Sequence, residues 1–256
     1  FALAYTLLAS SIGGLEVARV GDDERMQELK RRVASGKAFG NRVELITAAE
    51  AKARFPLLEE SMIQGALWDP DAGLVKPRSQ MVAGELVDAA VASGKLLSFA
   101  NTSCTGLRMD NGRIQGVETT KGFIAADYVV VCAGLWGRLI AGMAGEDLPI
   151  MPVDHPLTFF KPYLEFAGTG KDIGYPLLRD QGNSAYLRDT GDPKTPEGGQ
   201  IEWGYYEEKN PRMCHPRDLL EKEEARLSPS QRDLELDQIM APLERAIELT
   251  PILAEL

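Results

Sequence analysis

The spacing of apolar residues along the chain predicts five helices. Apolar residues recur at intervals of three and four over residues 22–39, which is typical of an amphipathic helix. Thr47 followed by Glu50 has the spacing of a capping box and predicts the start of a short helix at Ala48. The remaining helices are expected over 77–94, 136–143 and 233–248.

Two of these helices carry an apolar stripe that predicts a buried face. In the helix over 77–94, the expected buried face consists of Met81, Leu86, Val87, Ala90 and Val91. In the helix over 233–248, it consists of Leu236, Ile239, Met240, Leu243 and Ile247. Both helices are therefore expected to pack against a sheet or another helix.

Short β-like segments lie between the helices. An Asn111-Gly112 turn predicts a hairpin between two of them. Tyr128–Val131 is apolar throughout, so we expect a strand buried on both faces, as in the central sheet of a doubly wound fold. The other expected strands are around Leu15 and Val17 and over 65–69, 95–100, 103–110, 113–119, 123–127, 185–188 and 200–206, the last two paired. Helices and strands in this order predict a mixed α/β fold.

Composition and charge exclude several classes of function and partner. The 256 residues, 44% hydrophobic and 26% charged, describe an ordinary globular protein. A net charge of -10 disfavours nucleic acid and anionic membranes as partners. Three distant cysteines, Cys104, Cys132 and Cys214, show neither disulfide nor metal-ligand spacing, so we expect a cytoplasmic protein without a metal. A Gly-x-Ser-x-Gly elbow is also missing from the sequence, which argues against a hydrolase.

The glycines leave the cofactor question open. Gly13-Gly14 lacks the third glycine of a dinucleotide-binding turn, so the chain either binds no dinucleotide or has that turn upstream of Phe1. Gly134 follows the apolar strand, where a cofactor could approach the backbone closely. A plain turn at Gly134 explains the same residue equally well.

Eight different short motifs follow one another along nearly the whole chain. They are Gly13–Arg19, Glu44–Glu50, Phe55–Leu58, Gly65–Val75, Cys132–Trp136, Pro149–His155, Leu177–Asp180 and Tyr186–Arg188. In this order the chain resembles the dimethylglycine and sarcosine dehydrogenases. The wider class is that of the FAD-dependent oxidoreductases related to glycine oxidase and D-amino-acid oxidase.

This resemblance implies an internal fragment of a two-domain flavoprotein. Residues 1–75 and 148–256 would form a substrate-binding domain, a mixed β-sheet with flanking helices. Residues 76–147 would form part of a Rossmann-like FAD-binding domain. The phosphate-binding turn and a histidine that tethers FAD would precede Phe1, and the end of the FAD domain and a tetrahydrofolate-binding domain would follow Leu256.

The resemblance also assigns residues to the amine site. His155 would be the catalytic residue that accepts the proton of the substrate ammonium group. Tyr186 would be a second catalytic residue, and Tyr206 would bind substrate. From the residues alone, a structural or surface role explains His155 better than a catalytic one, and a half-buried strand position explains Tyr186 equally well. The chain continues with Pro156-Leu157 where the family has Gln-Tyr, which affects substrate specificity.

For FAD the resemblance points to the backbone of a few residues. Cys104 would lie near the adenine, Ala133, Gly134 and Leu135 would line the cofactor, and Trp136 would pack against them. Cys132 is expected to be a small buried side chain. Arg179 and Arg188 either hold a substrate carboxylate or form surface ion pairs.

The activity that the resemblance implies is oxidation of a C–N bond. The substrate would be a small N-methylated amino acid, demethylated with FAD as cofactor, and the iminium that forms would either hydrolyse or pass its one-carbon unit to folate. Two alternatives stay open on the sequence: a non-catalytic domain that keeps the fold without flavin, and an oxidase of the same fold that uses molecular oxygen.

Overall fold

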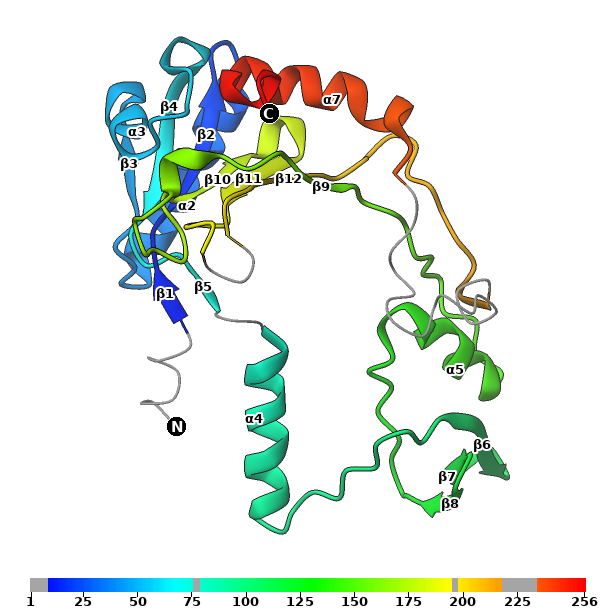
Figure 1. The fold of residues 1–256 in the computed structure, drawn as a ribbon. Helices are drawn as coiled ribbons and strands as arrows, with labels where there is room; N and C mark the ends of the chain where they lie inside the picture. The colour runs from blue at the N-terminus through cyan, green and yellow to red at the C-terminus, as the bar shows by residue number, and fades with distance from the viewer. Residues whose placement is uncertain (1–8, 76–78, 195–197, 218–233) are drawn as a thin grey trace. The chain divides into compact units, whose positions relative to one another are not determined.

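The computed structural model describes residues 9–75, 79–194, 198–217 and 234–256 (Figure 1). The chain divides into two compact units. Unit 1 comprises Phe1–Val82, His155–Glu208 and Leu234–Leu256, and unit 2 comprises Ala83–Asp154 and Lys209–Asp233. The boundary at Val82 falls inside helix α4 (Ser79–Ala92). This division does not say which unit binds cofactor or substrate, so the domain assignment over 1–75, 76–147 and 148–256 stays a prediction.

Unit 1 is built on a mixed sheet. Among the described residues this sheet has seven strands in the order β3-β4-β2-β10-β11-β12-β9. Strand β10 runs parallel to β2, and the other neighbouring pairs are antiparallel. The strands are β2 (Gly14–Arg19), β3 (Glu44–Ile46), β4 (Ile63–Asp69), β9 (Leu157–Phe159), β10 (Leu177–Asp180), β11 (Ala185–Asp189) and β12 (Ile201–Tyr205). The predicted mixed sheet with flanking helices is confirmed.

Two of the three helices of unit 1 begin within one residue of the predicted position, whereas the predicted start of the third, at residue 233, lies outside the described residues. In α2 (Asp23–Ala38), the Asp22 carboxylate caps the first turn by accepting from the Arg25 N–H at 2.9 Å. In α3 (Ala48–Arg54), Thr47 and Glu50 form the predicted capping box. The last helix is α7 (Leu236–Leu249). Short additional elements are β1 (Ala9–Ser11), β5 (Gly73–Val75), η1 (Glu60–Met62), η3 (Leu164–Phe166), η4 (Gln181–Asn183) and η6 (Pro251–Ala254).

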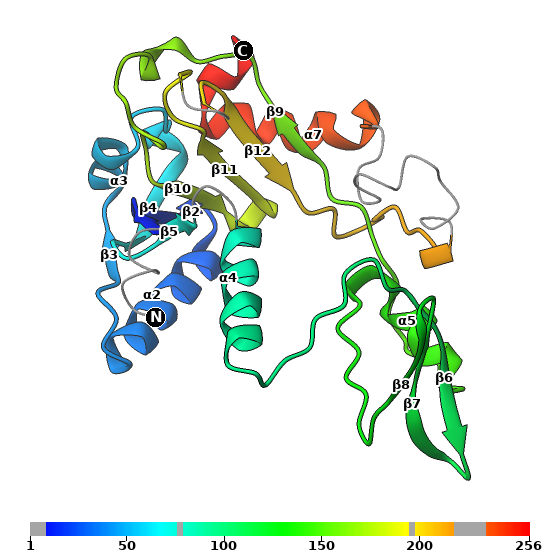
Figure 2. The same cartoon turned by 60° about the horizontal axis from the view of Figure 1, so that its bottom comes forward.

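The two faces of this sheet differ because successive strand residues point to opposite sides. One face forms the hydrophobic core with α3, α7 and η6, and α7 lies along β10, β11 and β12 (Figure 2). Helix α2 packs on the other face, where the position of a Cβ at Gly65 would be 2.9 Å from Met26 Cε. Residues of the core cluster include Leu15, Val17, Phe55, Leu187, Ile201, Trp203, Ile239 and Leu249.

A buried ion pair ties the core face together. The Arg19 guanidinium on β2 lies 2.9 Å from the Asp180 carboxylate on β10, and their side chains are 13% and 6% exposed. Arg19 also donates to the Arg245 carbonyl at 2.5 Å and contacts the Glu248 carboxylate at 3.1 Å, both on α7. The arginine therefore joins two strands to the helix that covers them.

Unit 2 contains a three-stranded antiparallel sheet and a short helix. Its strands are β6 (Cys104–Asp110), β7 (Arg113–Thr119) and β8 (Gly122–Ala125), in that order. Asn111 and Gly112 both have positive φ, 48° and 75°, as the predicted hairpin turn requires. Helix α5 (Gly137–Met143) follows η2 (Gly134–Trp136), and Met143 Sδ lies 4.0 Å from Cys104 Sγ.

Two predicted strands of unit 2 are absent from the structure. Residues 95–100 and 128–131 have no strand conformation, although Tyr128–Val131 is fully apolar. Tyr128 is 88% exposed and Val130 83% exposed. A strand needs a neighbour for its backbone N–H and C=O groups, and the described residues offer none here. Cys132, expected to be buried, is exposed for the same reason.

The predicted buried faces of α4 and α7 are also partly wrong. The apolar side chains of α4 stay exposed, because the described part of the chain places no element over them. On α7, Leu236 and Met240 are exposed, and the buried residues are Ile239, Pro242, Ala246 and Leu249. The exposed large apolar residues of α4 are Met81, Leu86, Val87 and Val91, and Ala90 is half-buried.

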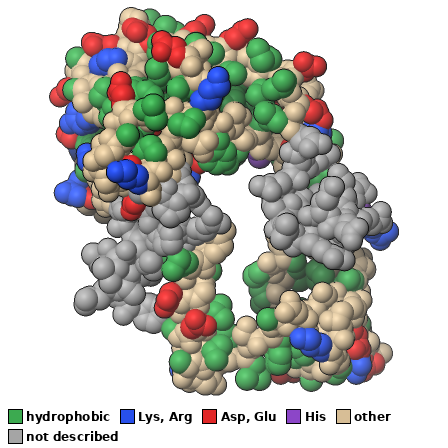
Figure 3. All heavy atoms as spheres, viewed as in Figure 1, with side chains coloured by type: hydrophobic (Ala, Val, Ile, Leu, Met, Phe, Trp, Pro, Cys, Tyr) green, Lys and Arg blue, Asp and Glu red, His purple; other side chains and the backbone are tan. Residues whose placement is uncertain are grey.

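The described residues show neither a membrane-spanning helix nor a metal-binding cluster. None of the helices in the described ranges has the length and apolar character needed to cross a bilayer. The same ranges bring together no group of three His, Cys, Asp or Glu residues that could hold a metal. Acidic and basic side chains are interspersed on the face of unit 1 seen in Figure 3.

Candidate functional site

Three aromatic side chains of unit 1 meet on the sheet face opposite the core. The His155 and Tyr206 rings are 4.7 Å apart between centroids and meet edge to face. The Tyr206 and Tyr186 rings are 5.5 Å apart and tilted by 42°. His155 precedes β9, Tyr186 lies on β11 and Tyr206 follows β12, so the sheet joins residues that are up to 51 positions apart. The structure therefore brings together the residues that the sequence proposes as catalytic and substrate-binding.

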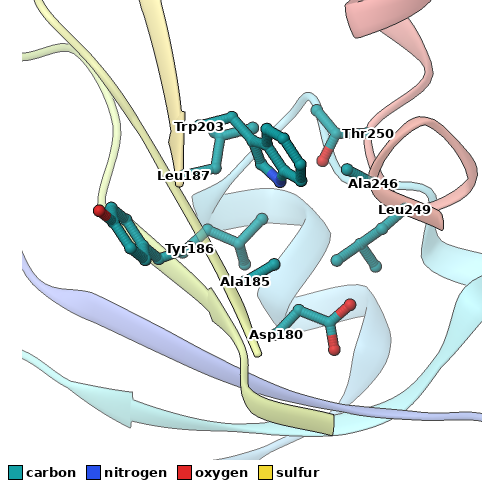
Figure 4. A pocket seen from close by; sticks show the side chains of 9 residues that line it. Asp180, Ala185, Tyr186, Leu187, Trp203, Ala246, Leu249 and Thr250 are labelled. Carbon is teal, nitrogen blue, oxygen red and sulfur yellow. The ribbon is translucent and has the colours of Figure 1, made fainter. Parts of the chain in front are cut away.

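Tyr186 owes its place to the alternation of β11. Ala185, Leu187 and Asp189 are buried toward the core, while Tyr186 and Arg188 point to the other face. Figure 4 shows Tyr186 directed away from Trp203, Leu249 and Thr250, which line a small cavity on the core side. The tyrosine is thus held by a strand whose other face is anchored in the core.

The environment of Tyr186 keeps its phenol protonated. Burial raises the pKa of Tyr186 to about 12, and the nearby Tyr206 and Glu202 act in the same direction. The Arg188 guanidinium lowers the pKa of Tyr186, but by less than burial raises it. Near neutral pH the Tyr186 hydroxyl is therefore available as a hydrogen-bond donor.

A cavity of about 230 Å³ opens beside these rings within unit 1. This volume is suited to a small molecule rather than to a peptide or a nucleotide. Strands β10, β11 and β12 form most of its wall, and both apolar and polar side chains line it. Residues at its wall include Leu74, Leu177, Arg179, Tyr186, Arg188 and Tyr206.

Of the two arginines at the cavity, one is paired. Arg188 contacts the buried Glu202 carboxylate on β12 at 2.5 Å, so the predicted ion pair is present for this residue. Glu202 is 6% exposed, and the contact neutralises a charge that would be costly to bury alone. Arg179 is exposed and forms no ion pair with the residues that the structure describes.

Residues proposed to bind the cofactor lie in unit 2. Ala133 leads into η2, and Gly134 has φ of +50°, with no described atom within 4 Å of the place of a Cβ. Leu135 and Trp136 continue this turn, and Trp136 Nε1 is buried without a hydrogen-bond partner among the described residues. Cys104 is the partly buried first residue of β6.

Sequence reasoning missed two residues of this candidate site. Gly204 lies opposite Tyr186 in the β11–β12 register, and Glu202 lies opposite Arg188. A glycine between large residues of a strand is a recognisable signal, because it marks a place where another group approaches closely. An acidic residue in a predicted buried strand is a similar signal for an ion pair.

Comparison with known proteins defines the class. The family described as FAD dependent oxidoreductase (DAO) matches residues 3–256, and the chain belongs to this family. The mitochondrial sarcosine dehydrogenase of Mus musculus is 29% identical over 246 residues, which cover 94% of this chain and 24% of that protein. The mitochondrial dimethylglycine dehydrogenase of Homo sapiens is 26% identical over 229 residues, 90% of this chain and 25% of that protein.

A solved structure supports the same fold. The L-proline dehydrogenase from P. horikoshii superposes with a TM-score of 0.73 at 25% sequence identity, over 99% of this chain and 60% of that one. Of the mitochondrial sarcosine and dimethylglycine dehydrogenases, by contrast, the chain spans only about a quarter of the length. The expected resemblance to the sarcosine and dimethylglycine dehydrogenases is confirmed.

Proposed function

We propose that the chain is part of an FAD-dependent enzyme that oxidises a C–N bond of a small N-methylated amino acid. The observation that carries this proposal is the His155–Tyr206–Tyr186 cluster beside a small cavity. The names of the similar proteins, sarcosine dehydrogenase and dimethylglycine dehydrogenase, support the substrate class.

The turn around Gly134 fits a cofactor that approaches the backbone. A positive φ and open space at the Cβ position leave the main chain of Gly134 accessible. Trp136 Nε1 is buried and has no hydrogen-bond partner in the described part of the chain, so it is a donor that a bound group can satisfy. We propose that Ala133, Gly134, Leu135 and Trp136 hold FAD, with Cys104 near its adenine; bound FAD would supply the acceptor for the hydride that leaves the substrate carbon.

In the proposed mechanism, His155 prepares the amine. A protonated amine has no lone pair to assist loss of hydride from the neighbouring carbon, so its proton must leave first. A neutral imidazole at His155 accepts that proton. Tyr206 meets the His155 ring edge to face at 4.7 Å and restricts its orientation, while the Tyr186 hydroxyl donates a hydrogen bond to the substrate.

Deprotonation leaves the free amine, and loss of hydride from its N-methyl carbon, to the acceptor that bound FAD would supply, would leave an iminium of the substrate. Water hydrolyses it to formaldehyde and the demethylated amine, or its one-carbon unit passes to tetrahydrofolate. In this proposal tetrahydrofolate accepts the one-carbon unit, and it does not accept the electrons. An oxidase that uses molecular oxygen shares every residue of this mechanism and differs only in what reoxidises the flavin.

A turnover assay of the full-length protein tests the proposal. Sarcosine and N,N-dimethylglycine are offered with an artificial electron acceptor, with oxygen alone, or with both, and formaldehyde is measured. The proposal requires formaldehyde from at least one N-methyl amino acid. Turnover with oxygen alone would identify an oxidase; a protein that holds no flavin would favour the non-catalytic alternative.

A further inference from the structure

A small cavity lies on the core side of the sheet in unit 1, between the strands and helix α7. Residues of β10, β11 and β12 line it, together with Ala246, Leu249 and Thr250 at the end of α7 (Figure 4). Its volume is about 20 Å³. A single water molecule needs roughly 10–15 Å³ of such space, so the cavity is large enough for one water and too small for an amino acid.

Two polar atoms at this cavity are buried without a partner. Trp203 Nε1, a donor, and Asp180 Oδ1, an acceptor, form no hydrogen bond with the residues that the structure describes. Their residues are 1% and 4% exposed. In Figure 4 the indole nitrogen and the carboxylate both face the space beside Leu249. Because burial of an unpaired donor or acceptor is unfavourable, a bound group is expected between them.

Neighbouring residues hold both groups in place. Asp180 Oδ2 accepts hydrogen bonds from Arg19 Nε and from Asn183 Nδ2, both at 2.9 Å, which leaves Oδ1 on the cavity side. The Trp203 ring lies parallel to the Tyr205 ring at 6.2 Å between centroids. Both residues are buried, so neither group can turn toward bulk solvent.

We infer that this cavity binds one water molecule, which accepts a hydrogen bond from Trp203 Nε1 and donates one to Asp180 Oδ1. A cation there would face the indole N–H, and an anion would face the carboxylate, whereas water both accepts and donates. Thr250, whose side chain also lines the cavity, carries a hydroxyl that offers a third partner. The water links β10 to β12 on the core side of β11, the strand that carries Tyr186.

A crystal structure of the full-length protein tests the inference directly. We expect an ordered water within about 2.7–3.2 Å of both Trp203 Nε1 and Asp180 Oδ1, the range of a hydrogen bond. A cavity without density would overturn the inference, and so would a direct hydrogen bond between the two side chains.

Two substitutions of Ala185 test whether the water contributes hydrogen bonds. Ala185 lines the cavity from β11, and valine and threonine there have nearly the same shape and both suit a strand. Either side chain displaces the water. Ala185→Val leaves the indole N–H and the carboxylate oxygen unpaired, so hydrogen exchange of the β11 and β12 amides should accelerate about 10-fold or more. In Ala185→Thr the new hydroxyl accepts and donates in place of the water, and exchange should stay near that of the wild type.

Hydrogen exchange is followed by mass spectrometry of the full-length protein, and β6 and β7 of unit 2 serve as the internal control. Slower exchange in Ala185→Val than in the wild type would show that the methyl groups fill a dry cavity, and would overturn the inference. Equal acceleration in both variants would reflect their shared volume, and the density in the wild type would then decide. Neither measurement uses an amine, so both outcomes are independent of the proposed function.

Discussion

The ring of Tyr186 lies over Gly204 on the adjacent strand β12. The two residues are partners in the β11–β12 register, and a Cβ at Gly204 would be 2.1 Å from Tyr186 Cζ and 2.3 Å from its hydroxyl oxygen. No side chain can share that space with the ring. The placement of the phenol at the cavity therefore depends on a glycine that contributes no chemical group of its own.

Gly204→Ala is expected to displace Tyr186 without unfolding the protein. The alanine methyl group forces the ring to move, since the residue's other neighbours in the strand are fixed by the core. Substrate affinity measured from the concentration dependence of flavin reduction should fall about 10-fold or more, in the range of a lost hydrogen bond. Gly84→Ala is the control, because no atom of the residues that the structure describes lies within 4 Å of its Cβ position. Wild-type affinity in Gly204→Ala would show that the ring position is unimportant.

His155→Ala is expected to slow flavin reduction by about 100-fold or more, the range for loss of a general base. The limiting rate is measured by rapid mixing of the full-length enzyme with N,N-dimethylglycine in the absence of oxygen. His215→Ala is the control, because His215 is exposed and its Nδ1 accepts a local hydrogen bond from the Arg217 N–H. An unchanged rate in His155→Ala would remove this residue from the mechanism.

Asp180→Asn is expected to destabilise the protein by about 3 kcal/mol, because it leaves the Arg19 guanidinium without its buried anion. Glu248 lies at 3.1 Å but is 56% exposed, so it replaces the lost partner only in part. The free energy of unfolding is obtained by urea titration. Glu28→Ala breaks an exposed pair with Arg31 and should leave stability near that of the wild type. Equal effects of the two substitutions would contradict a structural role for the buried pair.

Stability is expected to fall as the pH rises from about 10 to about 12. Burial raises the pKa of Tyr186 to about 12, and it also raises the pKa of Tyr163, Tyr175 and Tyr205. The folded protein therefore binds more protons than the unfolded chain in this window, and that stabilisation is complete below pH 10. Tyr186→Phe should reduce the loss of melting temperature across the window. Tyr128→Phe, which alters an 88% exposed side chain, should follow the wild type.

The sequence predicts well those elements of both units whose signals are local. Thr47 and Glu50 cap α3 through contacts three residues apart, and Asn111-Gly112 sets its hairpin by its own backbone conformation. His155, Tyr186 and Tyr206 came from a resemblance, and the sheet brings them together. None of these inferences required knowledge of distant partners.

Long-range partners account for what could not be predicted. Tyr128–Val131 has the composition of a buried strand, yet strand formation depends on neighbours that its own sequence does not encode. Whether Arg179 or Arg188 keeps a free charge depends on Glu202, which is 14 residues away from Arg188 and becomes its neighbour only through strand pairing. The role of Gly204 becomes visible only once its partner in that pairing is known.

An anaerobic visible spectrum of the full-length protein, recorded before and after addition of N,N-dimethylglycine, tests the central claim most directly. We predict a flavin absorption band that bleaches as the amine is oxidised. A band that persists with N,N-dimethylglycine, with sarcosine and with other N-methyl amino acids would contradict the proposed substrate class, and the absence of any flavin band would contradict the flavoenzyme itself.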